Sequence, residues 1–245
     1  MVDVAFTGAQ VRPADTAVVI DVLRATSTIG LALASGYERV LVAGSLEQAQ
    51  ALRAPGRVLA GERRCERPEG FDLGNSPEET LSPRGQELVL ATTNGAPAIL
   101  AAGEAATEVY AASLLNFDAM VATLSALDGD ILLVCAGTDG SATIEDTYLA
   151  GRLSAALGGQ RTDAAQIAEA VAAAYPRPLD ALDASIGAAN LRDVGLDADI
   201  TFCAQESILG VIPQLSTTID DVAVIEAVSE QPRAETAESS NSSST

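Results

Sequence analysis

Short apolar runs rich in valine, isoleucine and leucine alternate along this chain with alanine-rich segments of helical period. The apolar runs predict buried strands, and the alanine-rich segments predict helices that cover them. The expected strands are Val2–Phe6, Thr16–Val22, Arg39–Val42, Arg57–Ala60, Glu87–Thr92, Glu108–Ala111, Asp130–Cys135 and Ile200–Cys203. The expected helices are Thr26–Ser35, Leu46–Arg53, Ala96–Ala102, Leu114–Ala126, Ile144–Leu157, Asp163–Ala174 and Leu179–Leu191. This order is typical of an α/β protein with parallel-type strands.

A weak internal repeat adds to this picture. A shift of 69 residues, from position 18 to position 87, lays Val18–Asp21 on Glu87–Leu90 and Thr26 on Gly95. Each half then reads strand, polar loop, alanine-rich helix, strand, which suggests a duplicated β-α-β unit. Unrelated β-α-β units would share part of this pattern, so they are the alternative. Either way, polar residues that follow strands collect at the carboxyl edge of the sheet, where open α/β folds bind ligands.

Three expected loops follow strands and precede helices: Asp21–Thr28, Thr92–Gly95 and Cys135–Ser141. Exposed amides at the start of a helix bind anions, helped by the helix dipole. Threonine and serine at such positions are also ordinary helix caps. For each hydroxyl alone both interpretations stay open, whereas three such loops at one edge favour an anion site.

Several carboxylates stand where a solvated charge is unexpected. Asp21 ends an apolar run, and Asp72 lies between two apolar residues. Such a charge needs an ionic partner or a metal ion, and Arg24 is the salt-bridge alternative for Asp21. Glu145 and Asp146 are adjacent and point to different faces of a helix, so at most one is expected to serve a site directly. Carboxylates without imidazole or paired thiolates select Mg²⁺ or Mn²⁺ over Zn²⁺.

The composition excludes several kinds of phosphoryl-transfer site. The 245 residues contain no histidine, and all fourteen basic residues are arginine. Without lysine there is no P-loop, and without histidine there is neither a phosphohistidine nor an imidazole zinc site. No cysteine has an arginine at the spacing that cysteine phosphatases use. Asp21 lacks the second aspartate of the aspartyl-phosphate phosphatases, because Leu23 stands there.

The formal net charge of −20 predicts a surface that repels nucleic acid and anionic membranes, so neither is expected as a partner. Salt adaptation and a codon bias toward arginine and alanine both fit this acidity. A local cationic island interrupts it, made of Arg53, Arg57, Arg63, Arg64 and Arg67. The island is either a solvated loop or a site that captures a multiply charged anion.

Length and composition suit one α/β domain over residues 1–228, or two tightly joined lobes. Residues 229–245 are acidic and serine-rich without apolar periodicity, and we expect a disordered tail. No membrane-spanning run and no signal segment are visible, and the three scattered cysteines fit a reducing compartment. A cytoplasmic protein with buried thiols is therefore expected. The alanine-rich helices leave a homodimer open.

With these motifs the chain resembles the 2-phosphosulfolactate phosphatase family over roughly residues 1–215. The resemblance rests on Asp21–Ile29, Gly61–Arg63, Gly70–Glu78, Thr92–Gly95, Cys135–Thr138, Glu145–Asp146, Gly195–Ile200 and Cys203–Pro213. It implies a three-layer α/β/α fold with a mixed sheet. It also implies Mg²⁺-dependent hydrolysis of 2-phospho-3-sulfolactate to 3-sulfolactate and phosphate, a step toward coenzyme M. Two departures stand out: Arg64-Cys65 replaces a Gly or Asn-Gly, and Ala96 replaces a threonine.

The resulting hypothesis places Mg²⁺ on Asp21 and Asp72, with Glu62 or one of Glu145 and Asp146 completing the shell. The expected catalytic residues are Asp21, Arg24, Thr26, Asp72 and Asn75. The expected substrate-binding residues are Ser27, Arg63, Ser76, Thr92, Thr93, Asn94 and Gly95. Arg24 would grip the phosphoryl group of a small anionic phosphorylated substrate, and Arg63 its carboxylate or sulfonate. Water is the expected nucleophile and Asp21 the alternative. Rival functions are a phosphatase for another phosphorylated hydroxy acid and a non-catalytic anion-binding protein.

Overall fold

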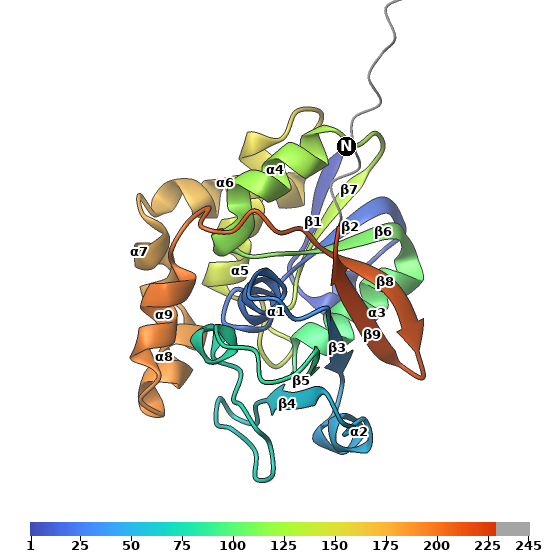
Figure 1. Ribbon diagram of the computed structural model, residues 1–245. Helices are drawn as coiled ribbons and strands as arrows, with labels where there is room; N and C mark the ends of the chain where they lie inside the picture. Colours follow the sequence, from blue (N-terminus) through green and yellow to red (C-terminus); the bar gives the residue numbers. More distant parts are fainter. Residues whose placement is uncertain (229–245) are drawn as a thin grey trace, which may run out of the picture.

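In the computed structural model, which describes residues 1–228, nine strands form one mixed sheet with helices on both faces (Figure 1). The strands are β1 (Val2–Ala5), β2 (Ala14–Ile20), β3 (Arg39–Ala43), β4 (Arg57–Gly61), β5 (Glu87–Ala91), β6 (Ala106–Ala112), β7 (Ile131–Cys135), β8 (Pro213–Ile219) and β9 (Val222–Ala227). The α-helices are α1 (Ala25–Ala34), α2 (Leu46–Ala51), α3 (Gly95–Ala105), α4 (Phe117–Ser125), α5 (Ile144–Ala156), α6 (Asp163–Ala174), α7 (Pro178–Asp183), α8 (Ile186–Asp193) and α9 (Asp197–Cys203). Short 3₁₀ turns are η1 (Gly8–Gln10), η2 (Pro77–Thr80) and η3 (Leu114–Asn116). The expected α/β/α class is confirmed.

The sheet has two parallel halves that an antiparallel hairpin joins. Its strand order is β1-β7-β2-β6-β8-β9-β3-β5-β4. Strands β1, β7, β2 and β6 run parallel to one another, and so do β3, β5 and β4. The hairpin β8–β9 lies between β6 and β3 and pairs antiparallel with both. The carboxyl ends of the parallel strands in each half therefore lie along one edge.

The central core lies between the two halves of the sheet and holds α1 and α3. Alternate strand residues such as Val19 of β2 and Leu90 of β5 face this core. The opposite face of β2, including Val18 and Ile20, packs on a second cluster with α5 and α6. Strands that are covered on both faces must be apolar throughout, which explains the continuous apolar runs of the sequence.

The two halves of the internal repeat correspond to two β-α-β units, but the strands of each unit pair with strands of the other unit. One unit is β2-α1-β3 and the other is β5-α3-β6. Strand β2 pairs with β6, and β3 pairs with β5, so each unit contributes one strand to each half of the sheet. The polar loop after β2 and the polar loop after β5 meet, because Gly95 lies against Ala25 and the carboxylate of Asp21.

The expected strand Ile200–Cys203 is wrong, because these residues belong to helix α9. A short apolar run has no clear period. Two aspartates in the first turn favour a helix start, and Ile200 and Cys203 then bury the same face. The expected helix Leu179–Leu191 is divided at Ser185, whose hydroxyl caps α8 by accepting from the amide of Ala188 at 3.0 Å.

Strands β8 and β9 are absent from the sequence prediction. Their turn is formed by Asp220 and Asp221, both with positive φ, as two-residue hairpin turns require. The polar face of β8 hides this signal, because Ser216, Thr217 and Thr218 interrupt the apolar alternation.

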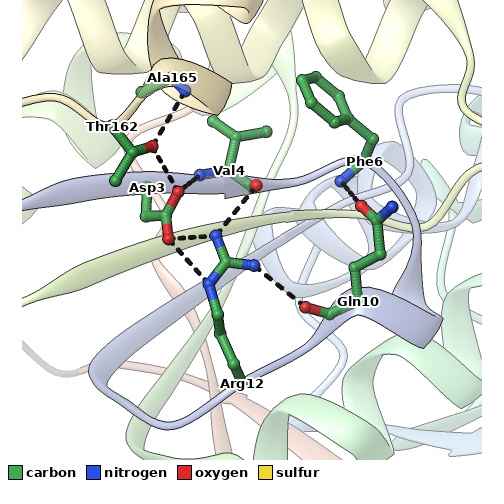
Figure 2. A network of polar contacts seen from close by, with 7 residues as sticks. All are labelled: Asp3, Val4, Phe6, Gln10, Arg12, Thr162 and Ala165. Carbon is green, nitrogen blue, oxygen red and sulfur yellow. Dashed lines mark hydrogen bonds and ion pairs between the residues drawn. The ribbon is translucent and has the colours of Figure 1, made fainter.

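A polar network fastens strand β1 to helix α6 (Figure 2). The hydroxyl of Thr162 donates to the carboxylate of Asp3 and accepts from the amide of Ala165 at 3.2 Å, which caps α6. The guanidinium of Arg12 binds the other oxygen of Asp3, with Nε at 2.8 Å. Burial alone would raise the pKa of Asp3, but the hydrogen bonds from Arg12 and Thr162 outweigh it and lower this pKa.

Within residues 1–228 no helix is both long and apolar enough to cross a bilayer. Cys135 and Cys203 are buried free thiols, as expected, whereas Cys65 is only half-buried. The tail predicted for residues 229–245 lies outside the described residues.

Candidate active site

Asp21 directly follows strand β2 and is held by the first turn of α1. Its Oδ1 accepts the amide of Ala25 at 3.1 Å. The hydroxyl of Thr26 accepts from the Asp21 amide at 3.1 Å and donates to the Asp21 carbonyl at 2.8 Å. The other oxygen, Oδ2, has no hydrogen-bond partner among residues 1–228 and faces Gly95, where a β-carbon would lie 2.9 Å away. Asp21 is thus fixed, with one oxygen left for a ligand.

Asp146 and Glu145 begin helix α5 and have different roles. Asp146 accepts the amide of Val22 on Oδ1 at 2.9 Å and the amide of Gly137 on Oδ2 at 3.0 Å. It therefore ties the loop after β2 to the loop after β7. Glu145 is buried, and within the described residues its Oε2 has no hydrogen-bond partner. Of the two adjacent carboxylates, Glu145 is therefore the one with an oxygen free for a ligand.

These three carboxyls share an unfavourable electrostatic environment. Burial raises the pKa of Asp21 to about 7, and the charge of Asp146 adds to the rise. Burial also raises the pKa of Glu145 to about 7, with the charge of Asp21 acting in the same direction. The pKa of Asp146 is raised to about 7 by burial and by the charge of Glu145. Ionising the three carboxyls together is therefore unfavourable in the protein alone, and no arginine within residues 1–228 is ion-paired with any of them.

Glu62 links two loops beside this cluster. Its Oε1 accepts the amide of Thr93 at 3.1 Å and the hydroxyl of Thr93 at 2.8 Å, and its Oε2 accepts the amide of Cys65 at 3.1 Å. The segment from Arg63 to Glu66 is a two-residue hairpin turn in which Arg64 and Cys65 have φ of 52° and 69°. Asparagine and glycine are the residues that favour these angles, so the turn suits the Gly or Asn-Gly of the family pattern better than the Arg64-Cys65 of this chain.

A cavity of about 610 Å³ opens at these loops. Its walls include the turn residues Arg63 and Arg64, the loop Thr92–Asn94, and Asn190 and Asp193 of helix α8. Asp21 lies next to this wall, since its carboxylate packs on Gly95 and its pKa responds to the charge of Glu62. The volume suits a small-molecule ligand, and Arg63 and Arg64 make no ion pair within residues 1–228.

Arg24 has a different neighbourhood from the one that the sequence suggested. Its Nη1 donates to Asp199 Oδ2 at 2.6 Å and its Nη2 donates to the carbonyl of Cys65 at 2.8 Å, so the salt-bridge partner is not Asp21. The hydroxyl of Ser76 donates to the other oxygen of Asp199 at 2.6 Å. Arg24, Asn75 and Ser76 line a second hollow of about 300 Å³, which adjoins the larger cavity at the half-buried Cys65.

Of the remaining predicted residues, some line the larger cavity and others do not. Thr92, Thr93, Asn94 and Arg63 line the larger cavity, whereas the hydroxyls of Thr26 and Ser27 are used within the loop, that of Ser27 donating to the Val22 carbonyl at 2.8 Å. Asp72 lines neither hollow. It lies beside the edge strand β4, where Oδ2 accepts the amide of Leu59 at 2.9 Å and Arg53 is 3.6 Å away. The structure does not bring Asp72 to the cluster of Asp21.

Sequence reasoning missed the contribution of helices α8 and α9. Asn190 and Asp193 of α8 line the cavity, and Asp199 of α9 holds Arg24. The available signal was Asp199, which belongs to the motif Gly195–Ile200 and directly precedes the run Ile200–Cys203 that was predicted as a strand. In Figure 1 helices α7, α8 and α9 gather at one side of the molecule, beside the segment that follows β4.

The cluster suits a hard cation that keeps part of its water. Among residues 1–228 no three acidic or cysteine side chains converge closely enough to form a complete metal cage. Mg²⁺ does not need one, because it commonly binds one or two carboxylates together with waters and substrate phosphate. The partnerless oxygens of Asp21 and Glu145, which stand in a cluster with excess negative charge, fit that coordination.

An α/β fold with acidic groups at its strand ends and an arginine-lined cavity defines an enzyme site for a small anion. The sequence profile of the 2-phosphosulpholactate phosphatase family matches residues 6–218. A protein of Thermus thermophilus is 40% identical over 217 residues, covering 86% of this chain and 92% of the relative. One of Thermotoga petrophila is 39% identical over 219 residues, covering 88% and 95%. Both are named probable 2-phosphosulfolactate phosphatase.

A relative of the same name from Deinococcus radiodurans is 40% identical over 210 residues, covering 82% of this chain and 88% of the relative. The chain therefore belongs to the 2-phosphosulpholactate phosphatase family, whose members are phosphoric monoester hydrolases. The family resemblance drawn from the sequence motifs is confirmed.

Proposed function

We propose that this chain hydrolyses 2-phospho-3-sulfolactate to 3-sulfolactate and phosphate and that it requires Mg²⁺. The observation that carries the proposal is the group of buried carboxyls Asp21, Glu145 and Asp146, which are costly to ionise together, beside a cavity with two arginines that make no ion pair within residues 1–228. Asp146 also holds two loops together, but a purely structural role does not account for the oxygens of Asp21 and Glu145 that have no partner within residues 1–228. The names of the relatives support the choice of substrate.

The substrate carries three anionic groups, and the cavity offers a place for each kind. Arg63 and Arg64 are set to bind the carboxylate and the sulfonate through charge-assisted hydrogen bonds. In the loop before α3 the amides of Thr92, Thr93 and Gly95 are already bonded within residues 1–228. The amide of Asn94 is therefore the one that this loop would offer to the phosphoryl group. Bound Mg²⁺, held by Asp21 and Glu145, would neutralise the charge of the phosphoryl oxygens.

Hydrolysis breaks the bond between phosphorus and the C2 oxygen and forms a bond between phosphorus and a water oxygen. A proton must reach the departing oxygen. Since the chain has no histidine or lysine, a carboxyl group is the natural proton carrier. Without a cation the pKa of Asp21 is raised to about 7 by burial, but bound Mg²⁺ would keep Asp21 and Glu145 ionised. The proton that the attacking water releases would then reach the departing oxygen through another carboxyl group or through water. Asp146 instead uses both oxygens on backbone amides and positions the loop.

We place this reaction on the route to coenzyme M, where 3-sulfolactate would be consumed. One observation favours a different phosphorylated hydroxy acid as the substrate. The departure at Arg64 puts an additional positive charge on the cavity wall, and that charge changes which anionic groups fit best. Phosphate release from 2-phosphosulfolactate, phospholactate and phosphoglycolate would rank these substrates.

The test is phosphate release with Mg²⁺ and after removal of divalent ions by a chelator. Turnover should need the metal, and Asp21→Asn should lower kcat by about 10²–10³-fold or more. Asp72→Asn is the matched control, because this aspartate lies outside the cluster, and it should retain wild-type turnover. Full activity in the chelated protein, or in Asp21→Asn, would refute the proposal. A protein that binds phosphate but never releases p-nitrophenol from p-nitrophenyl phosphate would be a non-catalytic anion binder.

A further inference from the structure

Helix α8 begins directly against the carboxylate of Glu145. A β-carbon on Gly187, the second residue of α8, would lie 2.4 Å from Oε1 of Glu145 and 3.5 Å from Cβ of Leu23. The first of these separations is shorter than non-bonded atoms tolerate, so any side chain at position 187 must move the carboxylate. Both Gly187 and Glu145 are buried, which leaves little room for such a movement.

The lack of room for a side chain, and not the backbone conformation, explains the glycine at position 187. Gly187 does not have the positive φ that favours glycine. Within a helix alanine is the better helix former. A glycine inside α8 therefore lowers local helix stability, and the absence of a side chain gives Glu145 its place.

We infer that Gly187 is a positioning residue that fixes the Glu145 carboxylate for a divalent cation. With Oε1 against Gly187, the partnerless Oε2 is the oxygen left for the cation. Ser185, two residues before Gly187, fixes the start of α8 by accepting the amide of Ala188 at 3.0 Å. Helix α8 thus lines the cavity with Asn190 and Asp193 and holds the Glu145 carboxylate at its first turn. This inference rests on the proposed function, because it takes Glu145 as a ligand of Mg²⁺.

The first measurement is Mg²⁺ binding by calorimetry to the wild-type protein, Gly187→Ala and Gly30→Ala. Gly30 is a matched control, since it is a buried helical glycine whose added β-carbon would make an ordinary contact of 3.7 Å with Leu209. Gly187→Ala should weaken Mg²⁺ binding about tenfold or more, as expected when a charged ligand oxygen is displaced. Gly30→Ala should bind Mg²⁺ as the wild type does. Equal affinity in all three proteins would overturn the inference.

A second measurement separates this contact from the metal. Urea unfolding with a chelator present would compare Gly187→Ala in the wild-type background and in the Glu145→Asp background. The shorter aspartate leaves room for the β-carbon, so alanine should lower the unfolding midpoint with Glu145 and leave it nearly unchanged with Asp. The same loss in both backgrounds would refute a positioning role for Gly187. A wild-type protein that binds no Mg²⁺ would refute the proposed metal, while this cycle would still decide the contact.

Discussion

Replacing Asp21 by asparagine should stabilise the metal-free protein at alkaline pH while abolishing its activity. Asp21 is buried beside Asp146, and no cation is paired with it, because Arg24 binds Asp199. Asparagine has nearly the same shape, and its carbonyl can still accept the amide of Ala25. The substitution therefore removes a buried charge and retains the hydrogen bond.

The magnitude follows from the pKa of Asp21, which burial raises from 3.8 to about 7. A raised carboxyl pKa means that the folded state binds more protons between these values, so stability falls as pH rises through this window. At ~1.4 kcal/mol per pH unit, one carboxyl loses about 4 kcal/mol between pH 4 and pH 8. Since Asp146 and Glu145 titrate together with Asp21, their losses do not add. We expect Asp21→Asn to gain roughly 1–4 kcal/mol at pH 8 and less than half of that gain at pH 5, where only ~1.2 pH units of the window have been crossed.

Urea unfolding followed by circular dichroism at pH 5, 6, 7 and 8, with a chelator present, would measure this difference. Asp72→Asn removes the same charge from the half-exposed edge of β4 and controls for the overall net charge. It should show no comparable gain. If Asp21→Asn were no more stable than the wild type at pH 8, with the same dependence on pH, Asp21 would not be an uncompensated buried charge.

Two further substitutions test the turn and the β1 network. Arg64→Asn should raise the unfolding free energy by about 0.5–1 kcal/mol, because Arg64 has φ of 52° and asparagine suits that conformation better. It should also raise KM about tenfold through loss of a charge-assisted hydrogen bond. The control is Arg84→Asn, at an exposed arginine that lines neither hollow, which should change neither the unfolding free energy nor KM. Asp3→Asn should cost about 1–2 kcal/mol at pH 7. Hydrogen bonds from Arg12 and Thr162 lower the pKa of Asp3, so its contribution is present above its ordinary pKa and is lost as pH falls through the lowered value. If Asp3→Asn and the wild type had the same unfolding free energy in urea at pH 7, this prediction would be contradicted.

The fold was largely predictable because most strands are covered on both faces and therefore read as continuous apolar runs. Helix α6 was predicted with its correct bounds, and α5 to within one residue of its end. The hairpin β8–β9 was not predicted because β8 is partly exposed and polar. Helix α9 was mistaken for a strand because a short apolar run does not reveal its period.

The site was predictable where it depends on strand ends and unpredictable where it depends on long-range contacts. Asp21 and Glu145 meet because the loops that carry them follow β2 and β7, which are parallel neighbours. The loop Thr92–Gly95 follows a strand of the other half of the sheet and reaches Asp21 through the close packing of Gly95. Asp72 stands just as oddly in the sequence, but it pairs with the backbone of β4. The partner of Arg24, Asp199, is 175 residues away in the sequence, and no local pattern identifies such a contact.

A crystal structure with Mg²⁺ and a non-hydrolysable analogue of 2-phosphosulfolactate would test the central claim most directly. We predict one Mg²⁺ bound to Asp21 and Glu145, with the phosphoryl group toward Gly95 and the other anionic groups toward Arg63 and Arg64. An ion bound at Asp72, or the analogue bound in the cavity while the three buried carboxyls hold no ion, would contradict it.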